Sequence, residues 1–267
     1  MLLSCQENHV GGKTLAERCE TIQRLGFDGV ELIGRIFRES LDDYVRFFKG
    51  SSIKPTAICA GQRGSVLSPD HQERQRALAD IRNMLRFGGE IGCSGFIFVP
   101  IFGPPAVPNL SPWKSPVEIE NELLLNALTE LAPTAEKYGC PILLEPLNRY
   151  ETHFLNRLDQ AAPFCRKVKS RWVRVMADFF HMNIEETDIP AALTKHAKYI
   201  GHVHLADSTR GFPGTGHTDF RSGFLALKKA GYSGYMSLEV TKRNIKRAEV
   251  ELAQTLAFLR KQLKGLR

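Results

Sequence analysis

The run Pro141-Ile-Leu-Leu-Glu-Pro146 determines the predicted fold, because runs of the same kind recur along the whole chain. It is short, almost wholly apolar and bounded by prolines, which is typical of a buried strand. Segments with helical spacing separate it from its neighbours. The eight predicted strands cover residues 2–6, 29–33, 55–60, 95–101, 141–146, 173–178, 200–206 and 235–240.

The segments between the strands repeat apolar residues at intervals of three and four, as amphipathic helices do. One such segment carries the series Leu124, Leu128, Leu131 and Ala135, and another carries Leu252, Leu256, Leu259 and Leu263. Pro133 should kink the first helix or shift its start. Glycines 26, 139 and 231 follow helical runs, where a helix C-cap is expected.

Nearly continuous apolar strands are typical of parallel sheets covered by helices on both faces. Eight such units without a linker predict an α/β protein of the (β/α)8 TIM-barrel class, with residues 1–267 forming one domain. A doubly wound open sheet is the structural alternative. Its nucleotide-binding versions are disfavoured, because neither G-x-G-x-x-G nor a Walker loop is present.

The composition is compatible with several kinds of binding partner and does not distinguish between them. The 267 residues carry a formal charge of +7, which suits anionic partners such as sugar phosphates or nucleic acid, or simply gives an inert basic surface. The six cysteines form no C-x-x-C pair. The N-terminus turns polar too early for a signal peptide, and prolines interrupt the apolar stretch 92–107. We therefore expect a cytoplasmic protein without a membrane span.

Four consecutive strands in the second half end at or near a residue that can bind a divalent metal. The gaps between these residues are close to the length of one βα unit, since 267 residues divided by eight gives about 33. The carboxyl ends of barrel strands meet at one rim, so these side chains should converge there. The predicted ligands are Glu145, Asp178, His204 and Glu239.

Three carboxylates and one imidazole favour a single divalent ion, with Mn²⁺ expected first and Mg²⁺, Co²⁺ or Zn²⁺ as alternatives. Three acidic groups in one apolar mouth would repel one another unless a cation or protons neutralised them. A single acidic residue at a strand end is more often a helix cap or an ion-pair partner. Four potential ligands in successive strands, three of them acidic, are much harder to explain in that way.

The motifs around these residues resemble those of the D-tagatose 3-epimerase/D-psicose 3-epimerase group of the xylose-isomerase-like barrel superfamily. The resemblance is specific between about residues 140 and 240. It implies that Glu145, Asp178, His204 and Glu239 bind the metal, and that Glu151, His181 and Arg210 hold the O1 to O3 region of a sugar. The motifs are Glu145-Pro-Leu-Asn-Arg-Tyr-Glu151, Asp178-Phe-Phe-His-Met-Asn-Ile-Glu-Glu186, Gly201-His-Val-His-Leu-Ala-Asp-Ser-Thr-Arg210 and Gly231-Tyr-Ser-Gly-Tyr-Met-Ser-Leu-Glu239.

The expected reaction is epimerisation at C3 of a ketose through a cis-enediolate. The proton beside a carbonyl is weakly acidic, so the developing enolate oxygen needs stabilisation, which a metal provides. Glu145 and Glu239 lie on strands 5 and 8 and could work from opposite faces of the carbon, one removing the proton and the other returning one. His181 would orient an oxygen, and Arg210 would add positive charge.

Several features leave alternatives open. Thr215 is neutral where the epimerase group often has an acidic residue, so the distal end of the sugar is expected to be recognised differently. The basic run 241–247 would suit a phosphate on the substrate, although a solvated helix start is the simpler interpretation. Cys59 ends strand 3 and either lines the pocket or is an ordinary core residue. A homo-oligomer, dimer or tetramer, is typical of such barrels.

Rival functions remain as well. An aldose–ketose, sugar-phosphate or hydroxypyruvate-type isomerase could use the same metal and bases one carbon along. A nuclease of the endonuclease IV type shares the barrel, and the positive charge would suit DNA. It would need further histidines on strands in the first half, and strands 3 and 4 end without one. A non-catalytic sugar-binding barrel would not require two metal-bound carboxylates.

Overall fold

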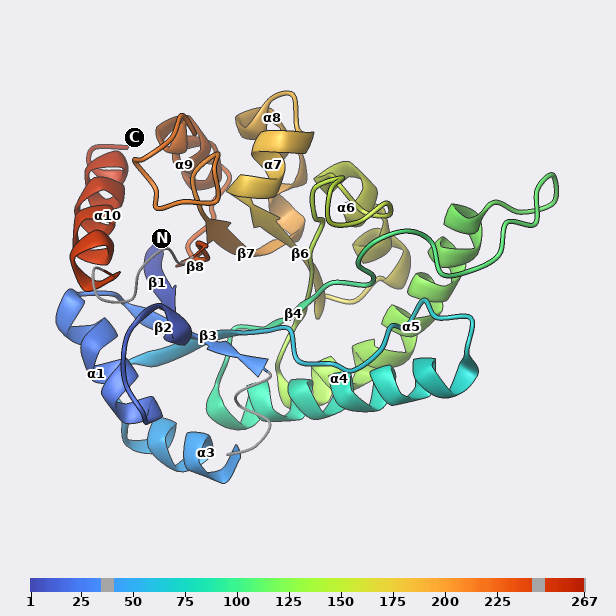
Figure 1. Ribbon diagram of the computed structural model, residues 1–267, viewed down its shortest axis with the longest axis horizontal. Coiled ribbons are helices and arrows are strands. Elements are labelled where there is room, and N and C mark those ends of the chain that lie inside the picture. Colours follow the sequence, from blue (N-terminus) through green and yellow to red (C-terminus); the bar gives the residue numbers. More distant parts are fainter. Residues whose placement is uncertain (35–40, 242–247, 267) are drawn as a thin grey trace.

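The computed structural model describes residues 1–34, 41–241 and 248–266. Eight parallel strands, paired in chain order, close into one barrel surrounded by helices (Figure 1). The first and last strands complete the closure, with Leu3 paired to Met236. The strands are β1 (Leu2–Gln6), β2 (Gly29–Ile33), β3 (Lys54–Cys59), β4 (Phe96–Phe98), β5 (Ile142–Leu144), β6 (Val173–Asp178), β7 (Ile200–Leu205) and β8 (Tyr235–Leu238).

The predicted barrel and its eight strands are confirmed, and the open-sheet alternative is wrong. Strands β4 and β5 are shorter than predicted. Their pairing ends at Phe98 and Leu144, and one more hydrogen bond follows from the Glu145 amide to the Phe98 carbonyl. Pro100 and Pro146 lie two residues after Phe98 and Leu144 and cannot donate to a ladder, which limits the pairing.

Helices follow the strands and cover the barrel from outside (Figure 1). Gly26 and Gly139 cap their helices in the left-handed conformation, as predicted, while Ala230 is the C-cap of the helix before Gly231. Pro133 does not shift a helix start, because its helix begins at Pro116 and continues through it. The helices are α1 (Leu15–Leu25), α3 (Leu41–Gly50), α4 (His71–Ile91), α5 (Pro116–Tyr138), α6 (Leu158–Val168), α7 (Phe179–Glu185), α8 (Ile189–His196), α9 (Phe220–Lys229) and α10 (Ala248–Leu263), with 3-10 turns η1 (Glu7–His9) and η2 (Ala197–Tyr199).

The main apolar core lies between the strands and the helices, whereas the barrel interior is divided in character. On one side, four apolar side chains from β3 to β6 pack together: Ala57, Ile97, Leu143 and Met176. On the other side, β1, β2, β7 and β8 contribute buried polar side chains, namely Ser4, Gln6, Glu31, His202, His204 and Ser237. This polar half leads to the strand ends where the predicted ligands lie.

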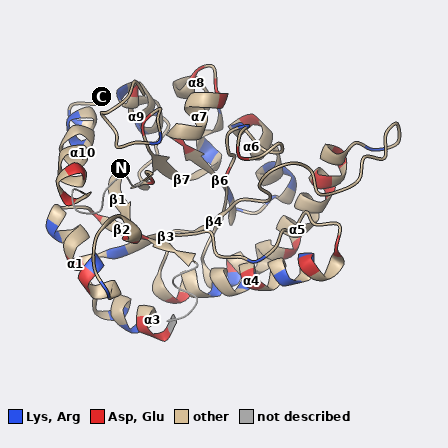
Figure 2. Cartoon of the chain, viewed as in Figure 1, with Lys and Arg blue, Asp and Glu red and all other residues tan. Residues whose placement is uncertain are grey.

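The outer surface carries both signs of charge. Figure 2 shows Lys and Arg beside Asp and Glu along the same outer helices, for example α4 and α10. The basic run 242–247, considered above for a phosphate, lies outside the described residues. Within the described parts of the chain, no helix combines the length and apolar character that crossing a membrane demands.

Candidate metal centre

The four predicted ligands converge at the carboxyl rim of the barrel. Asp178 ends β6 and His204 lies in β7, while Glu145 and Glu239 follow directly after β5 and β8. Each offers a ligand atom within 4.8 Å of the others. The first three are buried and Glu239 is half-buried, so the cluster has one partly open side. Convergence of this kind is what parallel strands in a closed barrel produce.

The two ring nitrogens of His204 face different partners. Its Nε2 lies 2.9 and 3.0 Å from the two carboxylate oxygens of Glu31, at hydrogen-bond distance. Its Nδ1 faces the cluster, 3.2 Å from Glu239 Oε2 and 3.9 Å from Glu145 Oε1. Because a carboxylate only accepts, Nε2 carries a proton, and Nδ1 is the atom left to bind a cation.

The crowding of three carboxylates is visible in their proton affinities. Burial, together with the nearby charges of Glu239 and Asp178, raises the pKa of Glu145 well above its usual range. Burial also opposes ionisation of Glu239, but the charges of His204 and Arg210 outweigh it and hold the pKa of that carboxyl below its usual range. The metal-free cluster therefore keeps a proton that a divalent ion would replace.

Asp178 adds a direct indication that the donor set fits a metal. Its Oδ1 accepts the Phe180 amide at 2.7 Å and caps α7. Its Oδ2 is buried and has no hydrogen-bond partner among the described residues; His181 Nε2 lies 3.5 Å away. A buried carboxylate oxygen without a partner is costly, and a cation within the cluster would satisfy it.

His181 is fixed at the rim by Asn148. Its Nδ1 accepts the Asn148 backbone amide at 3.0 Å, so that nitrogen is unprotonated. Burial lowers the pKa of the ring, which favours its neutral form. The Nε2 side faces Asp178 Oδ2 and the guanidinium of Arg210, at 3.5 and 3.1 Å. The ring therefore lies beside the cluster, between Asp178 and Arg210.

Arg210 brings positive charge to the same place. One of its nitrogens donates to Glu239 Oε2 at 2.7 Å, and another lies 3.5 Å from Glu151 Oε1. Its guanidinium sits 4.7 Å from the centre of the Phe180 ring. Asn148 also donates to Glu151, at 2.9 Å. The structure thus brings the three predicted sugar-contacting residues together beside the four predicted ligands.

Sequence reasoning missed the residues that support the cluster from within the barrel. Gln6, Glu31 and His202 are buried there and join its hydrogen bonds. The available signal was a charged residue, Glu31, between Val30 and Leu32 in a buried strand. Cys59 does lie beside the cluster, with its sulfur 3.8 Å from Glu239 Oε1. Burial raises the pKa of this thiol well above its usual range.

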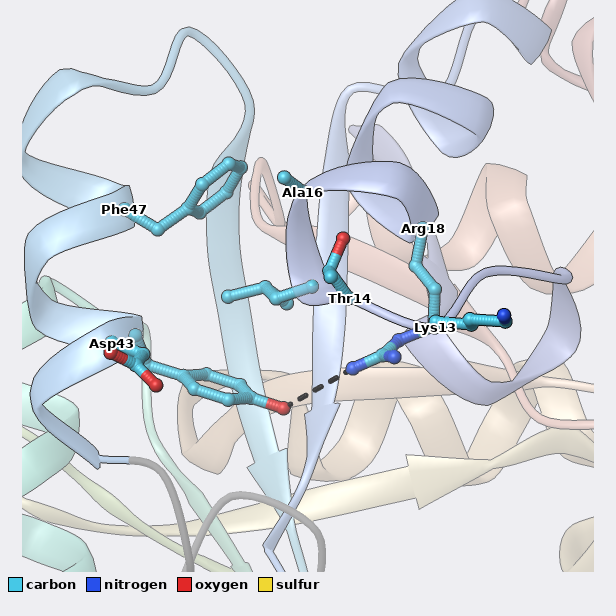
Figure 3. A pocket seen from close by; sticks show the side chains of 8 residues that line it. Lys13, Thr14, Ala16, Arg18, Asp43 and Phe47 are labelled. Carbon is cyan, nitrogen blue, oxygen red and sulfur yellow. Dashed lines mark hydrogen bonds between the residues drawn. The ribbon is translucent and has the colours of Figure 1, made fainter.

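A separate cavity of about 430 Å³ lies between α1 and α3 (Figure 3). Its walls include Lys13, Phe47 and Arg18, whose guanidinium is ion-paired to the buried carboxylate of Glu7 at 2.7 Å. None of the residues that line it belongs to the four-ligand cluster. The convergent polar groups of the barrel mouth, rather than this cavity, mark the candidate active site.

The fold and the site define a (β/α)8 barrel with a candidate metal centre at its carboxyl rim. The chain belongs to the xylose isomerase-like TIM barrel family, whose model matches residues 19–262. Its relatives are named as epimerases acting on sugars, and the chain is an isomerase of that kind.

Two relatives and one solved structure show the similarity over most of the chain. A protein of Escherichia coli named 3-dehydro-D-guloside 4-epimerase is 30% identical, covering 90% of this chain and 92% of its own length. A D-psicose 3-epimerase of Ruminiclostridium cellulolyticum is 28% identical, covering 82% of this chain and 76% of its own. The apo crystal structure of an E. coli 3-keto-D-glucoside 4-epimerase superimposes with a TM-score of 0.88 at 28% identity, over 98% of this chain and 99% of that one.

Proposed function

We propose that this sugar epimerase depends on one divalent metal ion and inverts a carbon beside a carbonyl, at C3 of a ketose. The observation that carries the proposal is the convergence of Glu145, Asp178, His204 and Glu239 around the unpartnered Asp178 Oδ2. Mn²⁺ is the preferred ion, with Mg²⁺, Co²⁺ and Zn²⁺ as alternatives. The partner is a small sugar or sugar phosphate rather than nucleic acid, and the site lies in one domain formed by residues 1–267.

The bound ion would supply Lewis-acid polarisation of the sugar carbonyl. Glu145 and Glu239 carry the proton transfers: one removes the proton from the carbon and the other delivers a proton to the opposite face of the enediolate. His181, Arg210 and Glu151 hold the oxygens of the sugar around that carbon.

A second substrate class has specific support. The E. coli relative named as a 4-epimerase of a 3-dehydro-guloside matches 90% of this chain, whereas an L-ribulose 3-epimerase of Mesorhizobium japonicum, although 42% identical, matches 42%. In both reactions the inverted carbon bears a hydroxyl and adjoins a carbonyl, so the same two carboxyls would serve. Isomerisation along an aldose–ketose pair uses this chemistry one carbon away.

The test is a panel of ketoses, ketose phosphates and 3-keto glycosides incubated with the Mn²⁺-loaded protein in D₂O and followed by NMR. Deuterium at C3 of a ketose supports the proposal, and deuterium at C4 of a 3-keto glycoside supports the second class. Deuterium at C1 or C2 indicates an isomerase. The absence of exchange in every substrate would refute carbon-acid chemistry.

The number of metal ions per chain distinguishes the proposed epimerase from the remaining alternative, a nuclease. About one ion per chain agrees with the four-ligand cluster, whereas three ions per chain, with cleavage of abasic DNA, would identify a nuclease of the endonuclease IV type. Strands β3 and β4 end at Cys59 and Phe98, where such a nuclease needs histidines. We expect one ion, a homo-oligomeric assembly and a cytoplasmic location; sedimentation and cell fractionation test the last two.

A further inference from the structure

Glu31 is a fully buried carboxylate at the centre of the polar half of the barrel interior. It has three hydrogen-bonding partners on two other strands, Gln6 on β1 and His202 and His204 on β7. His202 Nε2 lies 2.8 Å from its Oε2, His204 Nε2 lies 2.9 Å from its Oε1, and Gln6 Nε2 donates to Oε1 at 2.9 Å. The mechanism proposed above does not use this residue, yet it touches a candidate ligand.

Hydrogen bonds, rather than a second metal ion, link Glu31 to His202 and His204. The separations of 2.8 to 2.9 Å between Glu31 and the two imidazoles are ordinary hydrogen-bond distances. Ligands placed tetrahedrally about one ion, at bonds of about 2.0–2.1 Å, would stand about 3.3 Å apart. Glu31 can only accept, so both Nε2 atoms donate to it.

The consequence falls on His204. With one proton held at Nε2, Nδ1 is the ring nitrogen left to bind an ion; in the metal-free protein it lies at hydrogen-bond distance, 3.2 Å, from Glu239 Oε2. A histidine in the other tautomer would direct an N–H at the same point and block a cation. Carboxylates that accept the distal N–H of a metal-bound histidine fix its ring and strengthen it as a ligand.

Gln6 extends the arrangement to a second ligand. Its amide group donates to Glu31 Oε1 at 2.9 Å and to Glu239 Oε1 at 3.2 Å. The strand pairing places Gln6 directly beside Glu31, so both side chains enter the barrel at one level. Opposite Glu31, the pairing of β2 with β3 shifts register between Val30 and Leu32. One buried carboxylate thus contacts His204 directly and Glu239 through one amide.

We propose that Glu31 is a positioning residue for the metal centre: it fixes the His204 ring with Nδ1 toward the ion and, through Gln6, sets the orientation of Glu239. This inference rests on the proposed metal-dependent function. It assigns Glu31 no part in proton transfer at the substrate. Gln6 and His202 hold the Glu31 carboxylate in place by occupying its remaining acceptor positions.

The Glu31→Gln variant tests the proposal, because an amide of the same size has one acceptor oxygen instead of two. The matched control is Glu120→Gln. Glu120 is also fully buried and lies 2.7 Å from His153 Nε2, but it contacts no residue of the cluster. Mn²⁺ affinity is measured from the EPR signal of the free ion during titration of the metal-free protein, and circular dichroism monitors folding.

We expect Glu31→Gln to weaken Mn²⁺ binding by about 10- to 100-fold and Glu120→Gln to leave it unchanged. Equal Mn²⁺ affinity in the wild type and Glu31→Gln would overturn this inference alone. A wild-type protein that binds no Mn²⁺ would overturn the proposed function as well.

A second measurement does not depend on how the variant folds. In the Zn²⁺-loaded wild type with ¹⁵N-labelled histidine, the His204 ring should show a proton on Nε2 and the metal on Nδ1. The signal is assigned by its loss in His204→Gln. A ring that binds Zn²⁺ through Nε2 would contradict the positioning role, whatever the Glu31 variant does.

Discussion

The Asp207→Asn substitution tests how the loop after β7 holds Arg210 at the site. The Asp207 carboxylate is buried, and its Oδ1 accepts the backbone amides of Ser208 and Thr218 at 2.8 and 3.0 Å. Its Oδ2 accepts the Gly214 amide at 2.8 Å. The Arg210 backbone, which has φ of 56°, donates to the Asp207 carbonyl at 2.8 Å. Asp207 therefore organises the turn that presents Arg210.

An asparagine at this position keeps one acceptor oxygen and turns the other into a donor. If the amide oxygen takes the place of Oδ1, the new NH₂ group faces the Gly214 N–H. One buried amide is then unsatisfied, at a cost of about 1–3 kcal/mol. For a chain of this length the melting temperature should fall by about 2–12 °C. We also expect kcat/KM to fall by about tenfold or more, because Arg210 loses its fixed placement.

The assay is thermal unfolding followed by circular dichroism, with Asp219→Asn as the matched control. Asp219 is exposed and caps α9 by accepting the Ser222 amide at 3.0 Å, a role that asparagine performs equally well. The control should keep the wild-type melting temperature. If Asp207→Asn also kept it within 1 °C or so, the carboxylate would not be what organises the loop.

The same carboxylate gives a pH dependence with a defined sign. Burial opposes its ionisation, but the amides of Thr218 and Ser208 outweigh burial and lower the pKa of Asp207 below its ordinary value. A lowered pKa contributes stability above the unfolded-state pKa of about 3.9, and this contribution is lost as the pH falls through the folded-state pKa. The difference in melting temperature between the wild type and Asp207→Asn should therefore narrow below about pH 4.

Three further predictions concern the packing, the bases and the ion. Gly223→Ala should lower stability by about 1–3 kcal/mol in urea unfolding, because its Cβ would lie 2.5 Å from Phe179 Cε1, whereas Gly50→Ala meets nothing within 4 Å and should not destabilise. Glu145→Gln and Glu239→Gln should each lower kcat by about 10²–10⁴-fold. Each variant should still exchange deuterium into one of the two epimers of the substrate, and the two variants should differ in which epimer that is. A variant that exchanges deuterium into both epimers would refute the two-base assignment. Removing metal with EDTA should abolish exchange and lower the melting temperature, and Mn²⁺ should restore both; full activity without metal would refute the proposed cofactor.

The fold was readable because a (β/α)8 barrel repeats one local pattern eight times. Each strand is buried on both faces, so its apolar run stands out from the flanking helical spacing. The strand ends were less certain where proline intervenes, as at Pro100 and Pro146. Pro133 does not shift the start of α5 for a local reason: it lies late in the helix, which already begins at a Ser115 cap with Glu118 in a capping box.

The four metal ligands at the carboxyl rim were predictable for the same reason, because one potential ligand recurs at the end of each successive strand in the sequence. The layer beneath it was not. The contact between Glu31 on β2 and His204 on β7 crosses the barrel interior, and no local pattern links residues so far apart. A charged residue in a buried strand indicates that a partner exists, but the partner can be identified only from the closed barrel.

The divided interior also explains why two similar carboxyls at the rim differ in proton affinity. Leu143, two residues before Glu145 and on the same face of β5, belongs to the apolar cluster, and burial raises the pKa of that carboxyl. Glu239 stands over the polar half, where His204, Arg210 and Gln6 contact it directly and stabilise its charge. In the metal-free protein, the unequal lining of the barrel therefore leaves the proton on Glu145 rather than on Glu239. Replacing Leu143 by a polar residue should lower the pKa of Glu145 without removing a ligand.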